Sequence, residues 1–138
     1  MSPDPDRIVI VGGPKVGKST LAAKFALEGY EIKATDDLVK PREPGGHSIE
    51  WSQLSDEVAT WYSRPGRWVV EGVAAPRALR KWLRSHSTGT PCDLLLIGSH
   101  PREKLKKRGQ ITMTAAVKLV LSEILPELRA RGVTVGSF

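Results

Sequence analysis

A stretch near the amino terminus has the residue types and spacing of a loop that holds phosphate. Residues 12–19 read GGPKVGKS and satisfy the pattern G-x-x-x-x-G-K-[ST] at each fixed position. Glycines let the backbone of such a loop bend until its N–H groups point inward at an anion. Lys18 then reaches the β- and γ-phosphates, and the hydroxyl of Ser19 is a ligand for Mg²⁺. The predicted nucleotide-binding residues are Gly12, Gly13, Pro14, Lys15, Val16, Gly17, Lys18, Ser19 and Thr20.

Three carboxylates follow later segments of the chain and suggest what the nucleotide is used for. Transfer of a phosphoryl group to a hydroxyl needs a base or an orienting group for the acceptor proton, and Asp36 and Asp37 are candidates for it. Glu71 ends the next apolar run. Asp93 lies at the start of the following apolar run. This is the wrong end of a strand for a metal ligand. This pattern favours transfer over the chemistry of a motor ATPase.

The order of the elements that carry these residues predicts an α/β fold. Apolar runs with strand character alternate with segments of helical periodicity, which is typical of a parallel sheet covered on both faces. The phosphate loop, both aspartates and Glu71 would then meet beyond the carboxyl ends of the strands. Strands are predicted at 7–11, 31–35, 68–72, 93–98 and 133–135, and helices at 20–27, 52–62, 76–85 and 112–131.

Length and composition predict one intracellular domain. The 138 residues fit a single domain, 1–138, of minimal nucleotide-binding size. No apolar run reaches the roughly 18 residues of a membrane span, and the first residues have no apolar signal stretch, so we expect a cytoplasmic protein. The single cysteine, Cys92, is expected to be a small buried side chain and not a nucleophile.

Charge is segregated along the chain. Residues 64–110 contain 11 basic and 3 acidic side chains, a net charge of +8, within a total of +6. Such a block favours a polyanionic partner. Binding of nucleic acid and a merely solvated basic face both remain open as explanations. Arg77 and Arg80 fall on one helix face and are candidates for DNA phosphates, and Trp51 is a candidate for stacking on an acceptor base.

These motifs resemble those of small P-loop kinases, among them nucleoside monophosphate kinases and polynucleotide kinase. Further stretches, such as 68–83 and 128–133, are similar to bacteriophage kinases that phosphorylate 5-hydroxymethyluracil in DNA. The resemblance implies the strand order 2-3-1-4-5, Asp36 as the base with Asp37 second, and a lid at about residues 100–111. It also places Glu71 where these kinases have the acid of the magnesium site, so that Glu71 joins Ser19 as a candidate for that site. A lid arginine would neutralise charge on the transferring group, and Arg102 and Arg108 are the candidates.

Three functions remain open from the sequence. The first is transfer of the γ-phosphate of ATP, with Mg²⁺, to hydroxymethyluracil in phage DNA, inside an infected cell. The second is a kinase for a free nucleotide or small metabolite, which keeps the same catalytic residues but needs no extended basic face. The third is a nucleotide-binding or accessory ATPase module without transferase activity, against which the Asp36–Asp37 pair argues. The oligomeric state is left open.

Overall fold

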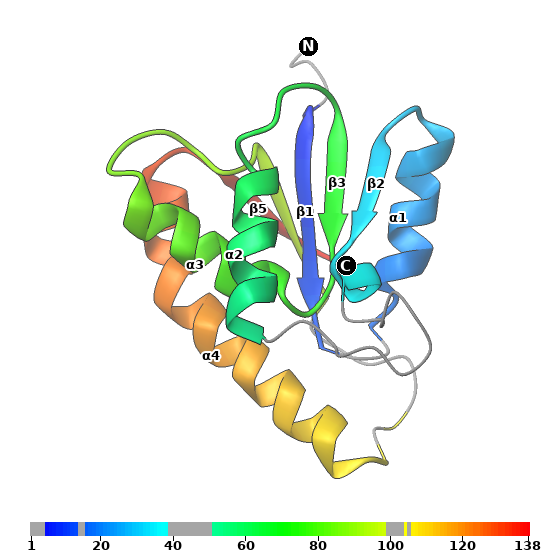
Figure 1. Cartoon of the computed structure of the whole chain (residues 1–138). Coiled ribbons are helices and arrows are strands. Elements are labelled where there is room, and N and C mark those ends of the chain that lie inside the picture. The colour runs from blue at the N-terminus through cyan, green and yellow to red at the C-terminus, as the bar shows by residue number, and fades with distance from the viewer. Residues whose placement is uncertain (1–4, 14–15, 39–50, 99–103, 105) are drawn as a thin grey trace.

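A computed structural model of the chain describes residues 5–13, 16–38, 51–98, 104 and 106–138 (Figure 1). Within these residues strands and helices alternate in the predicted order. The elements are β1 (Arg7–Gly12), α1 (Lys18–Leu27), β2 (Glu31–Ala34), the 3₁₀ helix η1 (Thr35–Leu38), α2 (Trp51–Trp61), β3 (Trp68–Glu71), α3 (Ala75–Ser85), β4 (Leu94–Gly98), α4 (Arg108–Ala130) and β5 (Thr134–Ser137).

The strands form one parallel sheet in the order β2-β3-β1-β4-β5. In its register Glu71 lies beside both Ile10 and Ala34, and Gly12 lies beside Gly98. The carboxyl ends of the central strands therefore share one edge. The α/β class, the parallel five-stranded sheet and the order 2-3-1-4-5 are confirmed, and the predicted P-loop character of the domain stays a prediction.

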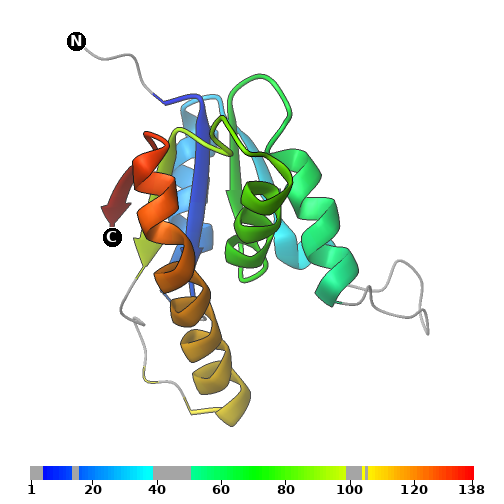
Figure 2. The same cartoon turned by 90° about the vertical axis from the view of Figure 1, so that its left-hand side faces the viewer.

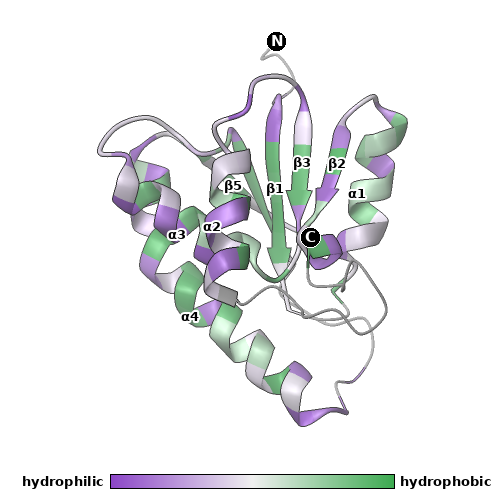
Figure 3. Ribbon diagram, in the orientation of Figure 1, coloured by the Kyte–Doolittle hydropathy of each residue, from purple (hydrophilic) through white to green (hydrophobic). Residues whose placement is uncertain are grey.

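Helices cover both faces of the sheet (Figure 2). The step from β1 to β2 runs in one direction along the sheet, and the later connections run in the other. With right-handed crossovers this reversal puts α1 on one face and α2, α3 and α4 on the opposite one. The alternation within β1 matches this division, because Ile8 and Ile10 pack in the cluster of α1, whereas Val9 and Val11 pack in the larger cluster. Figure 3 shows β1 as hydrophobic along almost its whole length.

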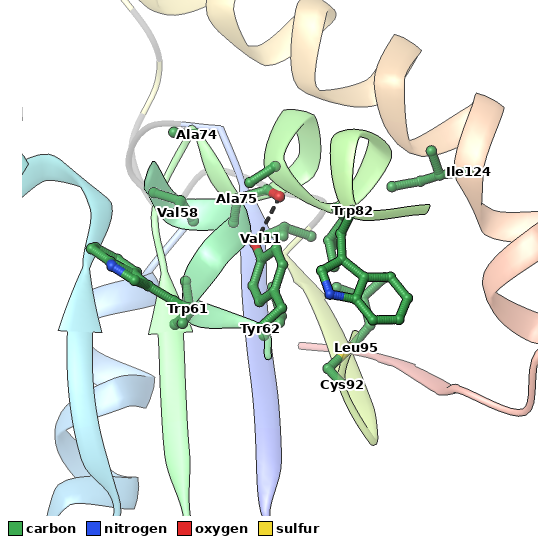
Figure 4. Packing of buried hydrophobic residues seen from close by; sticks show 14 of the residues in the cluster. Val11, Val58, Trp61, Tyr62, Ala74, Ala75, Trp82, Cys92, Leu95 and Ile124 are labelled. Carbon is green, nitrogen blue, oxygen red and sulfur yellow. Dashed lines mark hydrogen bonds between the residues drawn. The ribbon is translucent and has the colours of Figure 1, made fainter. Parts of the chain in front are cut away.

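The larger core holds the segment between β3 and α3 in place. Tyr62 is fully buried, and its hydroxyl donates a hydrogen bond of 2.9 Å to the carbonyl oxygen of Ala75 (Figure 4). Burial, with a smaller contribution from Cys92, raises the pKa of Tyr62 well above its usual value. Burial also raises the pKa of the Cys92 thiol to about 12, and the predicted burial of this cysteine is confirmed.

Helix α4 begins earlier than its sequence predicts. The expected start was Thr112, but the helix starts at Arg108 and takes in the end of the predicted lid segment. The preceding residue, Lys107, makes no side-chain cap, and Gly109 lies in the first turn, so the usual signals of a helix start are missing. Figure 1 shows these first turns extending beyond the edge at which the strands end.

Among the residues that the structure describes, no helix has the length and apolar character needed to cross a membrane.

Candidate functional site

The start of α1 has the geometry of an anion site. Gly17 precedes the helix in a left-handed conformation (φ 93°, ψ 24°) that favours glycine, and no side chain caps the helix there. The first N–H groups of a helix have no partner within it, and the helix dipole adds about half a positive charge at this end. The backbone N–H groups of Lys18, Ser19 and Thr20 are therefore oriented to receive phosphate oxygens.

The rest of the loop is packed tightly against two other elements. A Cβ atom on Gly12 would lie 2.7 Å from the carbonyl oxygen of Gly98 and 2.7 Å from Cγ2 of Val16. A Cβ atom on Gly13 would collide with the side chain of Thr114 in α4. These contacts leave room for glycine alone and hold the loop between β4 and α4. No pattern in the sequence indicates Thr114, whose role depends on where α4 crosses the loop.

Lys18 lies over the loop. Its Nζ atom donates a hydrogen bond of 2.7 Å to the carbonyl oxygen of Gly13. Burial lowers the pKa of Lys18, and the negative charges of Glu71 and Asp36 partly oppose that effect. The amine is thus a desolvated cation next to two carboxylates, and it would gain a compensating charge from bound phosphate.

Glu71 is the buried acid of the site. It ends β3 with 5% of its surface exposed. Its pKa is raised by burial and by Asp36, Lys18 opposes the rise, and Asp37 adds to it slightly. Asp36 therefore contributes to the pKa of both Lys18 and Glu71, and Asp37 contributes to that of Glu71. Both aspartates are exposed on η1, at the end of β2.

A close contact brings η1 to the end of β3. Gly72 has φ 137°, and a Cβ atom there would collide with the side chain of Thr35. Thr35 is fully buried, and its Oγ1 has no hydrogen-bond partner among the described residues. The absence of a side chain at Gly72 therefore lets the ends of β2 and β3 meet, which places Asp36 near Glu71. Sequence reasoning did not identify Thr35 or this use of Gly72.

The residues present fit a magnesium ion bound with a nucleotide. Mg²⁺ usually takes one or two protein ligands and completes its shell with phosphates and water. Ser19 in the first turn of α1 and Glu71 offer two such oxygens, and the raised pKa of Glu71 means that a nearby cation would stabilise its ionised form. No group of three or more metal-binding side chains occurs in the described part of the chain.

The predicted basic residues differ in their surroundings. Arg77, in the first turn of α3, is exposed and has no ion pair with a described residue. Arg80 contacts Glu123 of α4 at 3.3 Å. Arg108 is exposed at the first position of α4. Trp51 begins α2, but its side chain lies outside the described residues, as do Pro14, Lys15 and Arg102.

The structure thus brings together Lys18, Ser19, Asp36 and Glu71 at one edge of the sheet, with Asp37 beside them. The chain matches no protein-family model and no curated protein. Function is therefore inferred from the residues and their geometry.

Proposed function

We propose that the chain is an ATP-dependent kinase that transfers the γ-phosphate to a hydroxyl group. One observation carries this proposal: an uncapped helix start behind a tight glycine loop lies next to a desolvated lysine and a pair of interacting carboxylates. The loop suits the phosphates of a nucleotide, and the carboxylates supply a proton acceptor beside them. A site that only bound an anion would be weakened by the carboxylates, because they repel phosphate.

Each residue has a distinct role in the proposed reaction. The N–H groups at the start of α1 and the Lys18 amine hold the β- and γ-phosphates, and Lys18 exchanges its bond to the Gly13 carbonyl for one to phosphate. Asp36 takes the proton of the acceptor hydroxyl, and the oxygen of that hydroxyl bonds to the γ-phosphorus. The bond from that phosphorus to the bridging oxygen breaks, and ADP leaves.

Ser19 and Glu71 would hold Mg²⁺, which neutralises charge on the phosphates when it is bound. Asp36 is preferred over Asp37 as the base because Asp36 contributes to the pKa of Lys18, and Lys18 marks the γ-phosphate position. Arg108 is proposed to stabilise charge on the transferring group from the start of α4. Arg102 stays a candidate for the same role.

The proposed acceptor is hydroxymethyluracil in DNA. Resemblance to phage kinases of this activity supports it, as does the net charge of +8 in residues 64–110. The opposite charge of DNA would be drawn to this segment, whereas a small uncharged metabolite would gain little from it.

An acceptor screen tests the proposal. The chain is incubated with γ-labelled ATP and Mg²⁺, and DNA containing hydroxymethyluracil, ordinary DNA and free nucleotides are offered in parallel. Label should enter the hydroxymethyluracil DNA. Label in a free nucleotide alone would identify the second kind of kinase, and label in no acceptor would contradict the kinase proposal.

A further inference from the structure

A cavity of about 480 Å³ lies between the start of α3 and the first turns of α4. We call it the inner hollow. Val73, two residues after Glu71, lines it on one side, and Met113, next to the loop contact Thr114, lines it on the other. The inner hollow therefore borders the proposed reaction site. Its volume falls within the roughly 300–1,000 Å³ of cavities that hold small molecules.

The walls of the inner hollow are apolar and its charges are positive. Val73, Pro76, Met113 and Val117 supply hydrocarbon surface. Among the described residues that line it, the charged side chains are Arg77 and Arg108, with no carboxylate. A polyhydroxylated metabolite would find few hydrogen-bond partners there. An aromatic base joined to a phosphate would match both the walls and the charge.

A second cavity of about 350 Å³ adjoins the first and is lined by α2, α3 and α4. We call it the outer hollow. Arg77, Ala116 and Val120 line both hollows, so Arg77 stands at the boundary between them. Two further cations of the outer hollow, Arg80 and Lys81, are already paired with Glu123 at 3.3 Å and Asp56 at 2.7 Å. Arg77 has no such partner among the described residues.

Two adjoining cavities, with an exposed arginine between them that has no ion pair among the described residues, fit a polymer of alternating flat groups and anions. We propose that the groove formed by the two hollows binds two consecutive nucleotides of a single DNA strand. The acceptor nucleotide occupies the inner hollow, its neighbour occupies the outer hollow, and Arg77 contacts the phosphate that joins them. This inference rests on the proposed function and specifies its acceptor as an unpaired base within a strand, in place of a free nucleotide.

Filling the groove tests where the strand binds. The probe is a fluorescein-labelled single-stranded oligothymidylate with one hydroxymethyluracil, and its binding is followed by fluorescence anisotropy. Ala116→Phe puts a ring into both hollows and should weaken binding by about tenfold, the equivalent of one lost base-stacking contact. The control Ala115→Phe makes the same change at the exposed neighbouring position, which lines neither hollow, and should leave the affinity almost unchanged. Equal effects of the two substitutions would overturn the proposal.

Removing the boundary arginine tests the phosphate contact without disturbing the core. Arg77→Ala should reduce the slope of log affinity against log salt concentration by about 0.7, the loss of one phosphate contact to a single strand. Arg129→Ala removes the same charge from an exposed position at the far end of α4 and should leave the slope unchanged. Equal slopes for the two variants would overturn the proposal, and this comparison decides the matter even if Ala116→Phe fails to fold.

The length of the ligand tests whether both hollows are used. Thymidine dinucleotide should displace the labelled strand at a much lower concentration than thymidine monophosphate, whereas equal displacement would contradict binding of two nucleotides. Titration of the same protein with a fluorescent ATP analogue reports on the phosphate loop separately. ATP binding without groove binding overturns this inference alone, and failure of the unaltered chain to bind ATP overturns the proposed function.

Discussion

Lys18 is a cation that the folded chain keeps partly away from water. Among the described residues its amine makes one hydrogen bond, to the carbonyl oxygen of Gly13, and burial lowers its pKa despite the negative charges of Glu71 and Asp36. Retaining a charged group in such a place has a free-energy cost, and bound phosphate would offset it. The residue is therefore better explained by ligand binding than by stability.

Replacing this lysine should separate activity from stability. Lys18→Met should reduce transfer by about 10²–10³-fold, as removal of one charge-stabilising donor does in other enzymes. The same substitution should leave the ligand-free protein as stable as the unaltered chain or more stable. Rate assays and urea unfolding measure the two effects. A large loss of stability would mean that Lys18 is structural.

The pH dependence of that stability difference follows from the lowered pKa. The unfolded chain binds a proton at Lys18 more readily than the folded chain, so the cost of the charge is fully present below the folded pKa. The cost disappears as the pH rises from the folded pKa towards the unfolded value near 10.5. The stabilities of Lys18→Met and the unaltered chain should therefore converge over this range in parallel urea titrations. A constant difference would show that the charge of Lys18 is not the cause.

The two aspartates of η1 should differ in their contribution. Asp36→Asn should lower the transfer rate by about 10²–10⁴-fold, the usual contribution of a general base, with little change in ATP affinity. Asp37→Asn should have the smaller effect, because Asp36 contributes more than Asp37 to the charge around Glu71 and also contributes to that around Lys18. Rates and ATP binding are measured for both. The reverse order would assign the base to Asp37.

At the scale of elements, α4 is part of the loop's support. Gly13→Ala would force a Cβ atom into Thr114 and should destabilise the fold by about 1–3 kcal/mol, a typical effect of overpacking. The control Gly109→Ala meets no atom within 4 Å and should be neutral or stabilising by up to about 1 kcal/mol. Adding Thr114→Ala to Gly13→Ala should recover part of the loss. The urea midpoint checks all three, and a harmless Gly13→Ala would contradict the contact.

The elements themselves were largely predictable from the sequence, and their contacts were not. Short apolar runs and the helical spacing of Leu54, Val58 and Trp61 correspond to observed strands and to α2. The start of α4 was not predicted, because Lys107 provides no side-chain cap for the helix and Gly109 does not favour a helix. The packing of Thr35 on Gly72 joins two strand ends that are distant in the chain, so no local pattern could reveal it.

In the folded molecule, charge is less segregated than it is along the sequence. Within the basic segment, Arg67, Arg80 and Lys81 contact Asp6, Glu123 and Asp56, all of which lie outside that segment. Arg77 and Arg108 remain exposed beside the inner hollow. The sequence could predict an excess of cations, but only the fold shows which of them face an acid.

Removing the ion pair of Arg80 should show how such pairing affects DNA binding. Glu123→Gln should lower stability by less than about 1 kcal/mol, because the ion pair is partly exposed, and it should strengthen binding of single-stranded DNA. Glu57→Gln changes the net charge equally at an exposed position of α2 and serves as the control. Anisotropy titrations of both variants measure the effect. Equal gains would mean that net charge alone governs binding.

The destination of the γ-phosphate shows directly whether the chain transfers it to DNA. A single-stranded DNA with one hydroxymethyluracil is incubated with γ-labelled ATP, Mg²⁺ and the chain, then digested to nucleosides and separated. We predict label on the hydroxymethyl oxygen of that nucleoside, at a rate about 10²–10³-fold lower when Lys18→Met replaces the unaltered chain. Label found only as free phosphate, at a rate that the DNA does not change, would show hydrolysis in place of transfer and contradict the proposed kinase activity.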